Sequence, residues 1–103
     1  MVFEQAVILA GGRGERLKPI TDKVPKPMAP INGVPFLDYL IFSLLEQGIK
    51  KILVLSGYKH EVITRHYQDS KQIDIDFSIG MEHWDTGKRV VNAYDKLDNN
   101  FLL

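Results

Sequence analysis

The sequence predicts an α/β fold with a mainly parallel sheet. Two short, continuous apolar runs, at residues 5–10 and 52–55, each end in a glycine-containing turn, as expected for strands that are buried on both faces. After the first run and again after the second, apolar residues recur at helical spacing, so strands and helices alternate along the chain. The length of 103 residues allows one small domain and excludes two complete ones.

The first predicted strand, Gln5–Ala10, is followed by a long loop that reaches Pro35. The glycines and prolines in this loop exclude a long helix or a central strand. Loops of this length inside a compact domain are usually functional or disordered. Because apolar residues such as Leu17 and Met28 are spaced through it, we expect the loop to be ordered.

Helical periodicity begins at Phe36. Over 36–47 apolar residues recur every three or four positions, with Pro35 near the start and Gly48 where a left-handed cap would fall. A shorter amphipathic helix is expected over 60–67. The residues expected to face the core from the first of these helices are Leu37, Leu40, Ile41, Leu44 and Leu45.

The rest of the chain predicts a third helix between two strands. Residues 73–79 alternate between apolar and polar side chains, which indicates a strand with one buried face at the edge of the sheet. A helix is expected over 86–97, with Asp85 or Thr86 as its N-terminal cap. Phe101–Leu103 then begins a further strand, expected beside the first. The residues expected to face the core from the third helix are Val90, Val91, Tyr94 and Leu97.

These elements predict a Rossmann-like, three-layer α/β/α arrangement with right-handed crossovers. The last strand stops without a polar exit, so we expect residues 1–103 to be the truncated N-terminal part of a longer domain, or the strand to be completed by another chain. An unfinished sheet edge also favours self-association into a homo-oligomer.

Composition excludes several classes of protein. Lys and Arg number 13 and Asp and Glu number 13, a formal charge of +0, so nucleic acid is not an expected partner. The absence of cysteine excludes a disulfide scaffold and thiolate metal sites. No apolar stretch approaches the roughly 20 residues of a spanning helix, and no basic segment precedes the first apolar run. We expect a cytoplasmic protein that does not bind membranes.

The turn after the first strand is rich in glycine and positive charge. Open α/β sheets bind ligands beyond the carboxyl ends of their strands, and Gly11, Gly12 and Gly14 would let backbone N–H groups approach a nucleotide. Between Arg13 and Lys26 five basic residues stand against two acidic ones, which predicts a phosphate site. The alternative is a turn that only joins two elements and whose cations are solvated.

Two common phosphate loops do not fit this sequence. The dinucleotide fingerprint requires a glycine where Leu17 stands, and Pro19 prevents the helix that should follow. A Walker A loop would need a glycine at Glu82 and a serine or threonine at Arg89.

A different signature does fit. Its residues are Leu9-Ala10-Gly11-Gly12-x-Gly14-x-Arg16-Leu17-x-Pro19-x-Thr21-x-x-x-Pro25-Lys26-Pro27-Met28-x-Pro30. This signature resembles that of the sugar-1-phosphate nucleotidyltransferases, the enzymes that make nucleotide sugars, and the resemblance continues in the Pro-Phe-Leu of residues 35–37 and the Ser-Gly-Tyr of residues 56–58. The chain is therefore similar to the N-terminal portion of a nucleotide-diphospho-sugar transferase fold.

The resemblance implies an enzyme in which the phosphate oxygen of a sugar 1-phosphate attacks the α-phosphorus of a nucleoside triphosphate and displaces pyrophosphate. Arg16 would neutralise the triphosphate and the departing pyrophosphate, and Lys26 would bridge the α-phosphate and the sugar phosphate. Such chemistry depends on positioning and charge neutralisation. The nucleotide-binding residues that the resemblance implies are Leu9, Ala10, Gly11, Gly12, Gly14, Arg16, Glu82, Thr86 and Gly87.

Glu82 matches a position where this family often has Gln or Glu near the base. A carboxylate there can accept hydrogen bonds from guanine N1–H and N2–H₂, which makes GTP the favoured nucleotide. The alternative is a solvated loop carboxylate. Thr86-Gly87 resembles the family's Thr-Gly turn, but Lys88 replaces a small residue there.

The family holds Mg²⁺ with an aspartate just after the fourth strand, so the resemblance implies a Mg²⁺ ligand beyond Leu103 and little catalysis by these residues alone. His60, His66 and His83 lack the spacing of a metal site, so no metal ligand is expected within the chain. The sugars that the family implies are hexoses or heptoses for polysaccharide biosynthesis. The alternative function is a non-catalytic regulatory or assembly module of the same fold that binds nucleotide or sugar phosphate.

Overall fold

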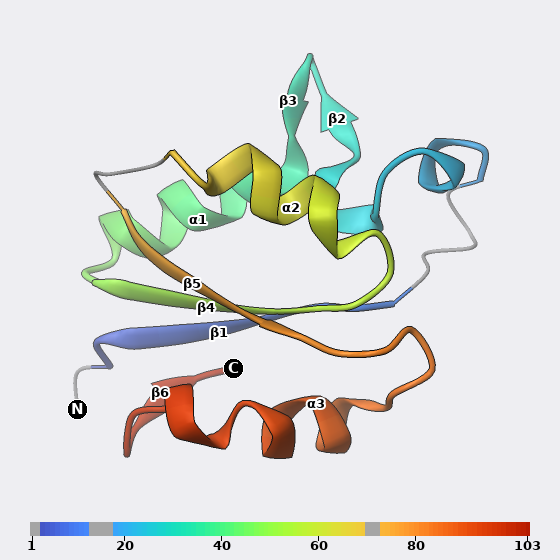
Figure 1. The fold of residues 1–103 in the computed structure, drawn as a ribbon. Coiled ribbons are helices and arrows are strands. Elements are labelled where there is room, and N and C mark those ends of the chain that lie inside the picture. The colour runs from blue at the N-terminus through green and yellow to red at the C-terminus, as the bar shows by residue number, and fades with distance from the viewer. Residues whose placement is uncertain (1–2, 13–17, 70–72) are drawn as a thin grey trace.

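A computed structural model describes residues 3–12, 18–69 and 73–103 (Figure 1). Its centre is a four-stranded sheet with the strand order β5-β4-β1-β6, in which each neighbouring pair is parallel. The parallel α/β fold predicted from the sequence is therefore confirmed. The strands are β1 (Gln5–Ala10), β4 (Lys51–Ser56), β5 (Asp74–Ile79) and β6 (Phe101–Leu102).

The order of the strands matches the expectations in two respects. The strand predicted over 73–79 is β5, at one edge of the sheet, and the strand expected to begin at Phe101 is β6, beside β1. β1 pairs with β4 over its whole length but with β6 only at Gln5 and Ala6. Within the described part of the chain, the carboxyl half of β1 is thus paired on one side only.

Helices cover both faces of the sheet, as the three-layer prediction requires (Figure 1). α1 (Phe36–Glu46) and α2 (His60–Tyr67) lie on one face, and α3 (Thr86–Asn92) lies on the other with the 3₁₀ helix η4 (Tyr94–Lys96). Pro35 is the N-cap of α1, and Gly48 follows the helix with a φ of 95°, so the predicted boundaries of this helix are confirmed within one residue. None of the described helices is long and apolar enough to cross a membrane.

Two apolar clusters, one on each face, hold the layers together. On the side of α1 and α2, Leu37, Ile41 and Ile63 are at most 1% exposed and pack against inward-facing residues of β1 and β4. On the side of α3, Ala93 packs against a smaller cluster. The strand residues of the two clusters are Ala6, Ile8, Ala10, Ile52 and Val54 in the first and Val7, Leu53 and Leu55 in the second.

The predicted third helix is wrong in extent and in one part of its buried face. α3 ends at Asn92, and Val91 and Tyr94 are 75% and 76% exposed. The face that points to the sheet is instead formed by Arg89 and Ala93, with Val90 partly buried beside them. Hydropathy favoured the larger apolar residues for the buried face. In the structure, the small side chain of Ala93 lets this part of the chain pack closely against the sheet, and Arg89 supplies hydrogen bonds at the strand ends.

The described part of the long loop is ordered, as predicted, and contains more structure than expected. It forms two 3₁₀ helices and a hairpin whose turn, Asn32-Gly33, has φ values of 53° and 81°. Asn-Gly is the commonest pair for a tight hairpin turn, but strands of two residues are too short to show periodicity. The elements are η2 (Ile20–Asp22), η3 (Lys26–Met28), β2 (Pro30–Ile31) and β3 (Val34–Pro35).

A buried amide joins β1 to the segment before β6. Gln5 is 4% exposed; its Nε2 donates to the carbonyl of Lys96 at 2.8 Å, and its Oε1 accepts from the backbone N–H of Asp98 at 2.8 Å. Nearby, Lys51 Nζ lies 2.8 Å from a carboxylate oxygen of Asp98, which raises the pKa of Lys51. These contacts position β6 against the amino end of β1.

Replacing Gln5 by leucine should lower the free energy of unfolding by about 1–3 kcal/mol, because the two hydrogen bonds that this buried side chain makes to the backbone are lost. The matched control is Gln68→Leu at an exposed position, where we expect a change within about 0.5 kcal/mol. Urea denaturation of both variants measures the difference. Equal stabilities would show that the Gln5 amide does not hold this segment.

A second polar contact joins α1 to α2. The Tyr67 hydroxyl donates to an Asp38 carboxylate oxygen, and His66 Nε2 lies 3.3 Å from the same carboxylate. Burial raises the pKa of Tyr67 well above its ordinary value, and the hydrogen bond to Asp38 raises it further. The folded protein therefore keeps this proton at pH values where the unfolded chain loses it.

Stability should consequently fall as the pH rises above about 10, the ordinary pKa of tyrosine, by up to about 1.4 kcal/mol per pH unit from this group. Tyr67→Phe should make the fall less steep, because the unfolded variant has no phenol at this position to ionise. Tyr94→Phe, at an exposed tyrosine, should keep the wild-type slope. Chemical denaturation between pH 8 and about 11 gives the comparison, and identical slopes for all three proteins would contradict it.

Candidate functional site

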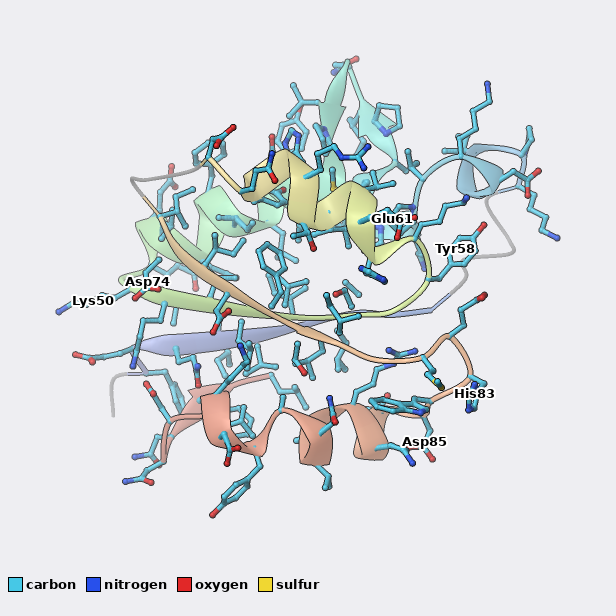
Figure 2. All side chains as sticks on the ribbon, in the orientation of Figure 1. Lys50, Tyr58, Glu61, Asp74, His83 and Asp85 are labelled. Atoms are coloured by element: carbon cyan, nitrogen blue, oxygen red, sulfur yellow. The ribbon has the colours of Figure 1, made fainter. Side chains whose placement is uncertain are left out.

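Three strands end in glycine at the same edge of the sheet. Gly11 follows β1, Gly57 follows β4 and Gly80 follows β5. Figure 2 shows Tyr58 and His83 at this carboxyl edge, while Lys50 and Asp74 lie at the opposite end of the sheet. In open α/β folds, ligands bind outside the carboxyl ends of the strands, so this edge is the candidate site.

The side chain of Arg89 joins the three strand ends. It is 5% exposed, and its Nη1 donates to the Ser56 carbonyl at 3.2 Å. Its Nη2 lies 3.2 Å from the Gly11 carbonyl, 2.8 Å from that of Met81 and 3.1 Å from that of Glu82. One guanidinium group thus links the ends of β1 and β4 to the loop after β5.

The three glycines leave the space that this guanidinium and its neighbour Trp84 occupy. A Cβ added to Gly11 would lie 2.2 Å from Arg89 Cζ, and one added to Gly57 would lie 2.6 Å from Arg89 Nη1. A Cβ added to Gly80 would lie 2.4 Å from the Trp84 ring. Side-chain atoms do not approach so closely, so a side chain at any of these three positions would displace Arg89 or Trp84.

Gly12 differs from Gly11 in this respect. A Cβ added to Gly12 would meet no atom within 4 Å, and the residue is exposed. The sequence offered one reason for both glycines, the approach of a nucleotide to the backbone. For Gly11 the described contacts supply another reason, the guanidinium of Arg89, whereas Gly12 stands at an open surface where a ligand could approach.

The loop after β5 is held at both ends. The Gly80 N–H donates to the Ser56 carbonyl at 2.8 Å, and Asp85 caps α3 by accepting from the Lys88 N–H at 2.8 Å, as predicted for this residue. Lys88 Nζ lies 5.1 Å from the centre of the Trp84 ring, within range of a cation–π interaction. Between these anchors, the Glu82 side chain is exposed at the carboxyl edge.

Lys26 lies exposed between two buried residues of the signature. Pro25 is fully buried and Met28 is 6% exposed, in the cluster on the side of α1. The Met28 N–H donates to the Pro25 carbonyl at 2.9 Å and the Ala29 N–H to the Lys26 carbonyl at 3.0 Å, which closes the turn. The core therefore anchors both flanks of Lys26 and leaves its side chain in solvent.

The structure brings some of the predicted site residues together. Gly11 and Glu82 share Arg89 as a hydrogen-bond donor, and Gly12 follows Gly11 in the chain. Ala10 is 3% exposed at the end of β1, while Leu9 is 43% exposed. The structure does not bring the other predicted residues into contact with this group. Thr86 and Gly87 form the exposed first turn of α3, and no described contact joins Lys26 to the glycine turn. Gly14 and Arg16 lie outside the described residues.

Sequence reasoning missed Arg89. The signal available was the glycine after each of three strands, which indicates that something large fills the space between their ends. No pattern in the sequence says which side chain that is. In the sequence, Arg89 stands out only as a residue that breaks the Walker A pattern.

The donor sets near this edge do not amount to a metal site. In the described ranges, no group of three or more His, Asp or Glu side chains is arranged to hold a metal ion.

The fold, with its parallel sheet and helices on both faces, defines a Rossmann-like α/β protein of the open-sheet class. Within that class, the chain belongs to the nucleotidyl transferase family, whose profile matches residues 5–102. The resemblance to sugar-1-phosphate nucleotidyltransferases predicted from the signature is thereby confirmed.

Two curated relatives share one name. The D-glycero-alpha-D-manno-heptose 1-phosphate guanylyltransferase of Aneurinibacillus thermoaerophilus is 41% identical over 93 residues, and the one of Campylobacter jejuni is 48% identical over 84 residues. These alignments cover 89% and 81% of this chain but only 40% and 38% of the relatives. The chain thus spans well under half the length of either protein.

A solved structure also matches this chain over part of its own length. HddC from Yersinia pseudotuberculosis, in a crystal structure complexed with GMP-PN, superposes with a TM-score of 0.78 and is 36% identical. The superposition covers 93% of this chain and 44% of HddC. The fold described above is therefore that of the family.

The two neighbouring glycines should respond differently to substitution. Gly11→Ala should lower the free energy of unfolding by about 1–3 kcal/mol, because its methyl group would overlap the Arg89 guanidinium. Gly12→Ala, whose methyl group meets open space, should change it by less than about 0.5 kcal/mol. Thermal or urea denaturation measures both. If the two variants were equally stable, Arg89 would not be the reason for glycine at position 11.

Proposed function

We propose that the full-length protein is a sugar-1-phosphate nucleotidyltransferase that forms a nucleotide sugar and pyrophosphate from a nucleoside triphosphate and a sugar 1-phosphate. The observation that carries this proposal is the arrangement of the signature. Its glycine turn follows β1 at the carboxyl edge of the sheet, and its Lys26 side chain is exposed between two residues anchored in the core. The family match over residues 5–102 supports the same reaction.

The nucleotide we propose is GTP. The relatives named above are guanylyltransferases, and HddC was solved with GMP-PN. In this chain, the exposed carboxylate of Glu82 stands at the carboxyl edge, where it can accept hydrogen bonds from guanine N1–H and N2–H₂. Adenine and cytosine have no N–H group at the equivalent ring nitrogen, so the same carboxylate disfavours them.

The proposed reaction assigns a task to each basic residue of the signature. Lys26 bridges the α-phosphate and the sugar phosphate, which brings two anions together and lowers the charge that opposes attack. Arg16 neutralises the triphosphate and the pyrophosphate that leaves. Backbone N–H groups at Gly11 and Gly12 bind phosphate oxygens, and the open surface at Gly12 supports that role.

The proposal includes Mg²⁺, which would neutralise phosphate charge when bound. Among the described residues no group of three or more His, Asp or Glu side chains is arranged to hold a metal ion, and we propose that the aspartate that holds Mg²⁺ in this family follows Leu103. Within this chain, the proposal leaves charge neutralisation to Arg16 and Lys26.

The sugar we propose is a heptose or hexose 1-phosphate destined for a polysaccharide. Of the two sugars, heptose 1-phosphate is better supported, because it is the substrate named for the two guanylyltransferases that are 41% and 48% identical to this chain. A cytoplasmic location, where nucleoside triphosphates are available, is part of the same proposal.

A second candidate function is a non-catalytic module that binds the nucleotide or the sugar phosphate without transfer. One observation favours it. Lys88, in place of a small residue, projects beside Trp84 at the start of α3 and adds bulk where the backbone would otherwise approach the ligand.

Pyrophosphate release by the full-length protein tests the proposal. GTP, ATP, CTP, UTP and dTTP are each supplied with heptose 1-phosphate or hexose 1-phosphate and Mg²⁺. Release that requires both substrates, with GTP preferred, is the expected result. Binding of nucleotide without release would instead support the non-catalytic module, and the absence of both would contradict either function.

Lys26→Ala should lower turnover by about 100-fold or more, because the phosphates lose a fixed cation. The control is Lys50→Ala, which removes a lysine from the opposite end of the sheet (Figure 2) and should leave turnover within about twofold. Both variants should keep the wild-type melting temperature, since both side chains are exposed. Near-normal turnover of a folded Lys26→Ala protein would remove Lys26 from the mechanism.

A further inference from the structure

Arg89 is a buried cation with no anionic partner in the part of the chain that the structure describes. It is 5% exposed, and no described Asp or Glu forms an ion pair with it. Its acceptors are four backbone carbonyls. Burying a charge is costly, and a well-packed apolar side chain at the same place often serves stability equally well. The four hydrogen bonds to carbonyls offset this cost, and an apolar side chain could not form the links between chain segments that they make.

The hydrogen bonds of Arg89 connect two loops with different tasks in the proposed enzyme. Nη2 binds the carbonyl of Gly11, which begins the phosphate-facing turn. The same atom binds the carbonyl of Glu82, whose side chain is the proposed reader of the base. A nucleotide spans the distance from base to phosphate, so the spacing of these loops decides whether both ends can be contacted at once.

We infer that Arg89 is a positioning residue for base selection: it holds the Glu82 loop at a fixed place relative to the glycine turn. This inference rests on the proposed function, because it takes Glu82 as the group that contacts the base. Arg89 itself touches neither base nor phosphate in this arrangement. It acts through the backbone carbonyls of Gly11 and Glu82, and through those of Ser56 and Met81 beside them.

The geometry explains why no other residue type would serve. A guanidinium group presents its N–H donors in a rigid plane, so one side chain can reach carbonyls from three chain segments. A lysine side chain would carry the same charge but would donate from a single nitrogen atom. A methionine side chain would have a similar length but no hydrogen-bond donor. The glycines at 11, 57 and 80 provide the space for this planar group and the adjoining ring.

The test uses the full-length protein with Arg89→Met, which keeps the stem and removes the donors, and Arg89→Lys, which keeps the charge. Arg65→Met is the matched control, because Arg65 is exposed on α2, on the other face of the sheet. Circular dichroism melts establish that each variant is folded at the temperature of the assays. If Arg89→Met does not fold, Arg89→Lys supplies both measurements.

The first measurement needs no nucleotide. Hydrogen exchange is followed at the N–H groups of Tyr58, Gly80 and Trp84, which donate to the Gly11, Ser56 and Met81 carbonyls. In both Arg89 variants these N–H groups should exchange about tenfold faster or more, while Val54 in the middle of β4 keeps its protection. Unchanged exchange at all three positions would overturn the inference that Arg89 holds these loops.

The second measurement is the ratio of dissociation constants for ITP and GTP, which differ only in the N2 amine. The wild type and Arg65→Met should prefer GTP by about tenfold, the worth of one charge-assisted hydrogen bond. Arg89→Met should reduce this ratio to about twofold or less, as should Glu82→Ala, which removes the carboxylate acceptor. Because both changes remove the same contact, the double variant should lose no further selectivity.

A purely structural role for Arg89 predicts a different result. Affinity for ITP and GTP would then fall together, with the ratio unchanged, and that outcome would overturn the inference. Additive losses in the double variant would also overturn it. If the wild type bound no nucleotide while its exchange pattern followed the prediction, the proposed function would fail and the anchoring of the loops by Arg89 would stand.

Discussion

The carboxyl edge of this sheet depends on one buried guanidinium group. Parallel strands bring their carboxyl ends to the same edge, but nothing in a parallel ladder fixes the loops that leave it. In this chain Arg89 donates to carbonyls at the ends of β1 and β4 and in the loop after β5. The requirement for glycine at positions 11, 57 and 80 follows from the space that this group and Trp84 occupy. Two side chains, Arg89 on α3 and Trp84 in the loop before it, thus restrict the residue type at three separate strand ends.

The fold could be predicted from the sequence where burial is decided by apolar residues alone. The runs at 5–10 and 52–55 became β1 and β4, and the face of α1 that carries Leu37 and Ile41 is buried as expected. Prediction failed where a polar or small residue decides the packing. In α3 the exposed Val91 and the buried Arg89 reverse the order that hydropathy assigns, because a side chain that satisfies carbonyls at three strand ends outweighs the burial of one more valine.

The site could be predicted only as far as its motif extends. The signature located the glycine turn and Lys26, since their order and spacing are contained in one stretch of chain. The contact between Gly11 and Arg89 joins residues far apart in sequence, and no local pattern encodes it. The same applies to the reason for the glycines: a glycine that admits a ligand and a glycine that admits an arginine look alike in sequence, and only the position of neighbouring atoms separates Gly11 from Gly12.

The two halves of the proposed site are supported by different parts of the fold. Arg89 and the strand ends hold the glycine turn and the Glu82 loop. The buried residues Pro25 and Met28 flank Lys26, and Met28 packs in the cluster on the side of α1. The hydrogen bonds of Arg89 involve none of the residues around Lys26, so replacing Lys26 leaves the contacts that hold the Glu82 loop in place. In the proposed enzyme, the positioning of the base and the charge neutralisation at the phosphates are therefore supported by different side chains.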